Sequence, residues 1–162
     1  MGMTPAFRLR DGRPGDEALL LRFIRELADY EKLLHEVRAT EADLAKLLFG
    51  PRPYAEALIV EKAGEPVGFA VWFYAVSTFD GCPSLYVEDV YVRPEHRGGG
   101  IGRAIFAELA RRAVAQGCLR MDWSVLDWNE PAKNFYRRIG AEAVRGWTVQ
   151  RLTGAALAAL AA

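Results

Sequence analysis

The chain has 162 residues, 51% of them hydrophobic, and its 21 basic and 21 acidic residues give a formal net charge of zero. A chain of this length and composition can bury a hydrophobic core, so we expect one folded domain over residues 1–162. The balanced charge argues against a disordered chain and against a general nucleic-acid-binding surface. Cys82 and Cys118 are too few for a disulfide framework, and we expect free thiols and no metal site.

The N-terminal half of the sequence predicts one strand, two helices and a hairpin. Thr40 to Asp43 have the pattern of a capping box, which marks the start of the second helix. Apolar periodicity gives the elements in chain order: a strand at 7–10, a helix from Pro14 to Tyr30, a helix at 44–49, and a hairpin of strands at 57–61 and 67–75.

The C-terminal half alternates strands with helices. We expect a strand at 85–92, a helix at 103–116, a strand at 119–125, a helix at 130–138, and a strand or hairpin at 141–152. The Ala-rich end, residues 154–162, predicts a short helix or a frayed tail. The resulting order, β-α-α-β-β-β-α-β-α-β, indicates an α/β fold in which helices cover both faces of a mixed sheet.

Residues 97–102, with the sequence RGGGIG, form a glycine-rich turn between the strand at 85–92 and the following helix. Backbone N–H groups in such a turn, together with the positive end of the helix dipole, bind anions. Glycine is suited to it because several N–H groups point at one ligand only when the backbone adopts dihedrals that other residues avoid. The turn therefore predicts a phosphate-bearing ligand, and the alternative is a tight turn without a ligand.

Two nucleotide-binding patterns do not fit this loop. A P-loop requires Lys and then Ser or Thr after its last glycine, whereas Arg103 and Ala104 follow Gly102. A dinucleotide-binding G-x-G-x-x-G run requires a glycine at position 103 or 105, and these positions are Arg and Ile. The pattern that fits is Arg-x-x-Gly-x-Gly at the start of a long helix.

This pattern resembles the coenzyme A pyrophosphate loop of the GNAT family of N-acetyltransferases. Three further segments strengthen the resemblance: LADYE at 27–31, LYVEDVYV at 85–92, and WNEP at 128–131 followed by NFY at 134–136. They are similar to segments of the spermidine/spermine acetyltransferases and their thialysine-acetylating relatives. The resemblance covers residues 7–152, leaves 153–162 as a tail, and implies a single domain with a mainly antiparallel sheet flanked by helices.

The resemblance implies acetyl-CoA as co-substrate, with no metal. It implies that the fourth and fifth strands splay apart, so that the pantetheine arm pairs with the backbone of Val90, Tyr91 and Val92. Asn129 either contacts the coenzyme or caps its helix. The residues expected at the coenzyme are Val90, Tyr91, Val92, Arg97, Gly98, Gly99, Gly100, Ile101, Gly102, Arg103, Asn129 and Pro131.

For catalysis, the resemblance implies that Glu88 acts as the base, directly or through water, and that Tyr136 protonates the departing thiolate. The alternatives are that Glu88 is an exposed charge at a strand end and that Tyr136 anchors its helix together with Phe135. Asp89 points to the opposite face of a regular strand, which favours a structural role. The reaction expected is direct transfer of acetyl from acetyl-CoA to a primary amine in a ternary complex.

For the acceptor, the resemblance implies contacts from Tyr30, Glu31, Glu88, Asp122, Trp123, Ser124 and Arg145. Arg145 is the departure, because the polyamine enzymes carry glutamate there, and an arginine repels a second cation. It suits a carboxylate instead, or is a solvated charge. Long polyamines are therefore less expected than diamines or lysine-like amines.

Other acceptors, such as aminoglycosides or protein amines, and a non-catalytic acyl-CoA-binding domain remain as alternatives. No segment has the pattern of a signal peptide or of an apolar run of about 20 residues that spans a membrane, so we expect a cytoplasmic protein. The resemblance also implies a homodimer. Phe73, Tyr74 and Phe79 are candidates for its interface or for the core.

Overall fold

A computed structural model describes residues 6–162 of the chain. These residues form two compact units, one ending at Leu126 and the other running from Asp127 to Ala162. The first unit contains the whole sheet. Its elements are β1 (Arg8–Asp11), α1 (Glu17–Tyr30), η1 (Leu34–Glu36), α2 (Glu41–Phe49), β2 (Glu56–Lys62), β3 (Glu65–Ser77), β4 (Cys82–Val92), η2 (Pro94–His96), α3 (Ile101–Ala115) and β5 (Met121–Trp123).

The five strands lie in the sheet in sequence order, β1-β2-β3-β4-β5. Strands β1 to β4 pair antiparallel, and β5 pairs parallel to β4. This mixed, mainly antiparallel sheet confirms the predicted α/β class. Strand β5 is shorter than the predicted 119–125.

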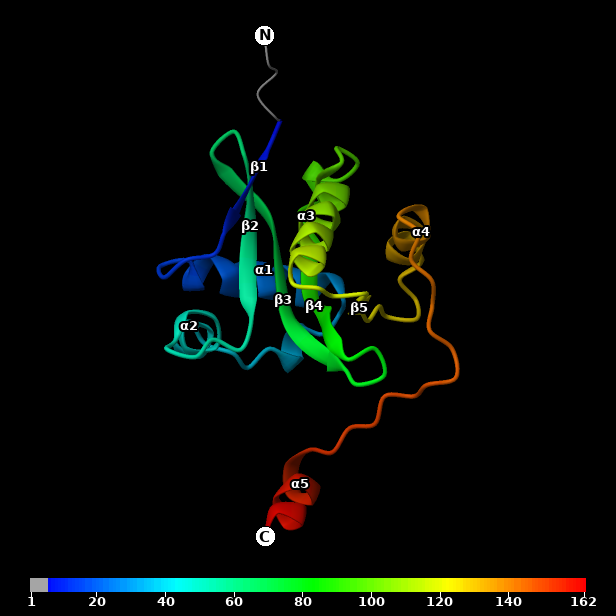
Figure 1. Cartoon of the computed structure of the whole chain (residues 1–162). Coiled ribbons are helices and arrows are strands. Elements are labelled where there is room, and N and C mark those ends of the chain that lie inside the picture. The colour runs from blue at the N-terminus through cyan, green and yellow to red at the C-terminus, as the bar shows by residue number, and fades with distance from the viewer. Residues whose placement is uncertain (1–5) are drawn as a thin grey trace. The chain divides into compact units, whose positions relative to one another are not determined.

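Helices cover both faces of the sheet, as predicted. Helices α1 and α2 pack on one face, where Phe23 stacks on Phe69 with ring centroids 5.5 Å apart. Helix α3 packs on the other face, where Ile105 and Leu109 are fully buried against the strands. Figure 1 shows α3 in front of the strands and α1 behind them.

The predicted capping box starts α2. The Asp43 backbone N–H donates to Thr40 Oγ1 (3.2 Å), and the Thr40 backbone N–H donates to the Asp43 carboxylate (2.9 Å). These reciprocal bonds satisfy two N–H groups that the helix itself leaves free. Helix α2 therefore begins at Glu41, earlier than periodicity alone predicts.

Strand β4 contains a bulge at Glu88. Val87 pairs with Trp72 and Asp89 with Val71, so Glu88 has no partner on β3. The extra residue changes which face the following side chains reach. Asp89 lies opposite a residue of the core beneath α1 and α2, whereas Val90 packs against the core beneath α3.

The second unit contains α4 (Glu130–Arg138) and α5 (Gly154–Ala161). The expected strand or hairpin at 141–152 is wrong, because this segment has no regular secondary structure. Val144, Trp147 and Val149 in it are 74%, 82% and 84% exposed. A segment with an apolar strand pattern forms a strand only where its backbone hydrogen-bonds to a neighbouring strand. Among residues 6–162, no strand pairs with this segment. Helix α5 confirms the helical alternative for the Ala-rich end, in keeping with the high helix propensity of alanine.

Of the aromatic residues considered for an interface, Phe79 is exposed, whereas Phe73 and Tyr74 are half-buried. Cys82 and Cys118 are free thiols. Among residues 6–162, no helix is long and apolar enough to cross a membrane.

Gly68 allows β3 and β4 to approach closely where β4 ends. It pairs with Val92, and a Cβ at this position would lie 2.6 Å from the carbonyl oxygen of Tyr91. That atom belongs to the backbone, so the clash is relieved only if the strands move apart. Gly68 therefore fixes the position of the last residues of β4.

We expect Gly68→Ala to lower the free energy of unfolding by about 1–3 kcal/mol, the usual cost of overpacking. Urea denaturation measures it. Gly99→Ala is the matched control, because its Cβ would meet no atom closer than the His96 carbonyl oxygen at 3.9 Å. Equal stability of the two variants would contradict the proposed close approach.

Candidate active site

The glycine loop leads directly into the N-terminus of α3. Gly98 and Gly100 adopt positive φ angles of 81° and 82°, and a Cβ at either position would meet no atom within 4 Å beyond its chain neighbours. These glycines are thus needed for their backbone conformation and not for packing. Gly100 is the N-cap of α3, and no side chain caps the helix there. The first turn of α3 therefore suits an anionic ligand.

Beside this loop, β4 has an open edge. Its pairing with β5 ends at Val87↔Trp123, although β4 continues to Val92. Within the described chain, residues 88–92 have β3 on one side and no strand on the other. Peptide groups along such an edge are free to bond an extended ligand that carries amides. The loop and edge together fit a ligand with a pyrophosphate and an amide-bearing arm, as coenzyme A has.

Carboxylates gather beside this edge. Asp89 is not on the face expected for a regular strand, because the bulge at Glu88 turns it toward the side of α1. Burial raises its pKa to about 7, and the charges of Glu88 and Glu31 add to this rise. Burial also raises the pKa of Glu31, at the end of α1. Glu88 itself is exposed.

Arg97 connects the end of α1 with the end of β4. Its guanidinium carbon lies 4.8 Å from the ring centroid of Tyr30 and 5.6 Å from that of Tyr91. Its Nε–H donates to the carbonyl oxygen of Val92 (2.8 Å). A residue predicted to contact the acceptor, Tyr30, therefore lies against one predicted to contact the coenzyme, Arg97.

The residues predicted on β5 and just after it face different ways. Trp123 points into the core beneath α3, where its ring lies 4.9 Å from that of Phe106. Asp122 accepts a hydrogen bond from Arg120 (2.8 Å), which balances its charge. Ser124 is hydrogen-bonded to the hydroxyl of Tyr86 (2.9 Å).

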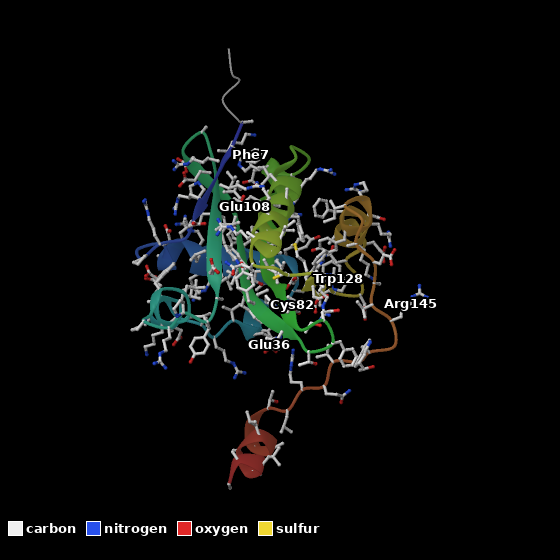
Figure 2. The ribbon with its side chains drawn as sticks, in the orientation of Figure 1. Phe7, Glu36, Cys82, Glu108, Trp128 and Arg145 are labelled. Carbon is white, nitrogen blue, oxygen red and sulfur yellow. The ribbon has the colours of Figure 1, made fainter. Side chains whose placement is uncertain are left out.

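Asn129, Pro131, Tyr136 and Arg145 belong to the second unit. Asn129 is buried and caps α4 by accepting a hydrogen bond from the Ala132 backbone N–H (3.2 Å). Pro131 lies in the first turn, where a missing N–H costs nothing. The Tyr136 ring meets that of Phe135 edge-on, 5.6 Å away. Arg145 is exposed on the extended segment after α4, labelled in Figure 2.

Residues 21–141 match the model of the Acetyltransferase (GNAT) family. The chain belongs to this family. It is an N-acetyltransferase, and enzymes of this family use acetyl-CoA to acetylate amines. The glycine loop and the open edge of β4 thus fit the co-substrate of the family.

Curated relatives and solved structures place the chain more finely. A thialysine N-epsilon-acetyltransferase of Bos taurus is 38% identical over 164 residues, covering 94% of this chain and 96% of that protein. An L-ornithine N5-acetyltransferase of Arabidopsis thaliana is 28% identical over 198 residues, covering 94% and 87%. An integron cassette protein from the mobile metagenome of V. cholerae has a TM-score of 0.80 at 27% identity, covering 99% of each chain. The predicted resemblance to the spermidine/spermine and thialysine subgroup is confirmed.

Two residues that the sequence does not single out for function lie beside the predicted site. Tyr86 lies two residues before Glu88, and its bond to Ser124 places it beside the predicted acceptor segment. Side chains alternate along a strand, so the position of Tyr86 two residues before Glu88 is the sequence signal for it. Asp89 lies on the side of α1 and not on the face that a regular strand predicts, because of the bulge at Glu88, which leaves no mark in the sequence.

We expect Asp89→Asn to flatten the pH dependence of stability. The pKa of Asp89 rises from 3.8 to about 7 on folding. The contribution of Asp89 to the free energy of unfolding is therefore fully present below about pH 4 and is lost as the pH rises to about 7. Between these pH values, the unfolding free energy of the native protein should fall by about 2–4 kcal/mol more than that of the variant. Denaturant titrations at several pH values measure this.

Asp29→Asn is the matched control, because Asp29 is an exposed carboxylate on the last turn of α1. It should have the same pH dependence as the native protein. If the free energy of unfolding changed equally with pH in the native protein and in Asp89→Asn, Asp89 would be solvated in the folded state.

Proposed function

We propose that this enzyme transfers acetyl directly from acetyl-CoA to the side-chain amine of a lysine-like amino acid, in a ternary complex. The observation that carries the proposal is the gathering of Glu31, Glu88 and Asp89 beside the open edge of β4. A cationic amine drawn to these carboxylates comes to lie next to the strand edge that suits the thioester arm. Proximity of this kind allows attack without a covalent enzyme intermediate.

On the donor side, acetyl-CoA supplies the activated acyl group. Backbone N–H groups of the loop and the first turn of α3 would hold its pyrophosphate, from Gly98, Gly99, Gly100, Ile101, Gly102 and Arg103. The backbone of Val90 to Val92 would pair with the pantetheine arm. An N–H on the same edge would donate to the thioester carbonyl and stabilise the charge that develops on its oxygen.

On the acceptor side, Glu88 attracts the ammonium group and passes its proton to water. Its carboxylate is exposed and thus within reach of an incoming amine. An alkyl amine has a pKa of about 10, so it arrives protonated and must lose that proton before it attacks. A cation next to Asp89 also offsets the two causes that raise the pKa of this residue, which are burial first and repulsion from Glu88 and Glu31 second. The acidic cluster therefore favours the acceptor in the place where it must react.

At the leaving group, Tyr136 donates its phenolic proton to the departing sulfur. The new N–C bond forms as the C–S bond breaks, and the two electrons of that bond leave with the sulfur. The amine proton goes to water through Glu88, and Tyr136 regains its proton from solvent. The products are the N-acetylated amine and free coenzyme A thiol.

Arg145 favours an amino acid over a polyamine. It lines a shallow hollow of the second unit with Arg137, Ala141, Glu142 and Ala143. Arg137 already contacts Glu130 and Asn134, so Arg145 is the guanidinium of this hollow that suits a carboxylate, which an amino acid has and a polyamine lacks. The thialysine and L-ornithine acetyltransferases among the relatives act on Nε and N5 amines of amino acids.

Thiol release tests the proposed function. We expect turnover of acetyl-CoA with thialysine, lysine and ornithine, weaker turnover with spermidine, and intersecting initial-rate lines. Tyr136→Phe should lower kcat about 10²-fold, because the thiolate then leaves without its proton. Tyr54→Phe is the control, since this exposed tyrosine precedes β2 and lies outside the proposed site.

Three results would contradict this function: no thiol release with any of the four amines, parallel initial-rate lines, or an unchanged kcat in Tyr136→Phe. Parallel lines would indicate an acetyl-enzyme intermediate. Each result bears on a different step of the mechanism.

We expect Arg145→Glu to reverse the acceptor preference. The variant should raise KM for thialysine by about tenfold, because a charge-assisted bond to its carboxylate is worth about 1.5 kcal/mol or more. It should lower KM for spermidine. Arg151→Glu, an exposed arginine of the same extended segment outside the hollow, is the matched control. Equal effects of the two substitutions would show that Arg145 is a solvated charge.

A further inference from the structure

We infer that the side chain of Arg97 positions Tyr30 for the acceptor, and so links the amine site to the coenzyme loop. The inference rests on the proposed function. The family pattern accounts for Arg97 only as the first residue of the glycine loop. The structure shows what its side chain contacts, and those contacts are with α1 and β4.

The Arg97 side chain reaches back from the loop. Its Nε–H is bound to the Val92 carbonyl oxygen at 2.8 Å, which fixes the plane of the guanidinium. The Tyr30 ring centroid is 4.8 Å from the guanidinium carbon, within the range of a cation–π contact. Tyr91 provides a second ring at 5.6 Å. The end of α1 is therefore held against the last residues of β4.

A second arginine makes the same kind of connection farther along α1. Arg93 donates two hydrogen bonds to the Glu26 carboxylate, at 2.7 and 3.0 Å, and lies 5.1 Å from the ring of Phe23. Arg93 and Arg97 stand on either side of η2, in the segment that joins β4 to the glycine loop. The difference is that Arg93 holds the middle of α1, whereas Arg97 holds its end.

The end of α1 matters because Glu31 follows Tyr30 there. Glu31 is one of the carboxylates whose charge raises the pKa of Asp89. When Tyr30 is held, Glu31 is held beside the bulge of β4. Without Arg97, the end of α1, which carries Tyr30 and Glu31, is no longer held against β4. The amine then binds less tightly. The chemical step takes place on other residues and should change less.

A double-mutant cycle tests this role. Arg97→Gln should raise KM for thialysine about twofold to fivefold, which corresponds to a cation–π contact at an exposed site. It should raise KM by more than it lowers kcat. Tyr30→Leu removes the ring, so Arg97→Gln should add no further rise in KM in that background. Tyr30→Phe retains the ring, and in it Arg97→Gln should still raise KM.

Two measurements without turnover accompany the cycle. Urea denaturation of the native protein, Arg97→Gln, Tyr30→Leu and their double variant, free of ligand, should show that the two substitutions change the free energy of unfolding non-additively. Calorimetry measures the affinity for acetyl-CoA, which Arg97→Gln should change less than it changes KM for the amine. Arg93→Gln is the matched control, and it should lower stability while leaving KM for thialysine near the native value.

Additive effects on KM would overturn the inference. So would a loss of acetyl-CoA affinity as large as the rise in amine KM, because the side chain then serves the pyrophosphate. Failure of the native enzyme to acetylate any amine is a separate outcome, which overturns the proposed function and this inference together.

Discussion

Strand β4 pairs with β3 from Cys82 to Val92, apart from the bulge at Glu88, but with β5 only from Leu85 to Val87, and the rest of the site depends on this difference. Pairing with β3 keeps the strand within the core, where Leu85 and Val87 are buried beneath α3. The early end of the β5 ladder leaves the last residues of β4 with one free edge. The edge paired with β3 keeps this part of the strand rigid, and the free edge allows its backbone to bind a ligand.

The bulge at Glu88 gives the same strand a second function. A regular strand would place Glu88 and Asp89 on opposite faces, so only one would reach the end of α1. The bulge exposes Glu88 and turns Asp89 toward α1. The cost is a half-buried carboxyl beside two others: burial, together with the charges of Glu88 and Glu31, raises the pKa of Asp89. Stability is reduced at the place where the proposed cationic substrate would restore it, and functional sites commonly reduce stability in this way.

Local signals in the sequence account for much of the fold. The amphipathic face of α1, the capping box at Thr40 and the glycines of the loop each act within a few residues, so they can be predicted from neighbours in the chain. The glycine loop predicted a phosphate-bearing ligand, and the family uses acetyl-CoA, which carries phosphates. Such signals fail where the outcome depends on a distant partner.

Three features of this chain depend on such partners. The bulge at Glu88 follows from the register of β3 against β4, and the contact of Arg97 with Tyr30 joins distant parts of the chain. The alternating residues at 147–149 have the pattern of a strand, but no ladder partner is present for them among residues 6–162. The sequence pattern of a segment indicates which structure the segment can form. Whether that structure forms depends on the distant residues that pair with it or pack against it.

The proposed donor and acceptor sites share one short stretch of backbone. In the proposed function, residues 88 and 89 would carry the charges for the amine and residues 90–92 would provide the edge for the thioester arm, so the spacing between the reactants would be fixed by covalent geometry. Arg97 adds a connection through side chains, because it bonds the carbonyl of Val92 and stacks on Tyr30. A shift of either β4 or the loop therefore moves both binding sites together. If Arg145 contacts the acceptor as proposed, selection for a new acceptor can act more freely there than at residues 88–92, because Arg145 lies outside this shared backbone.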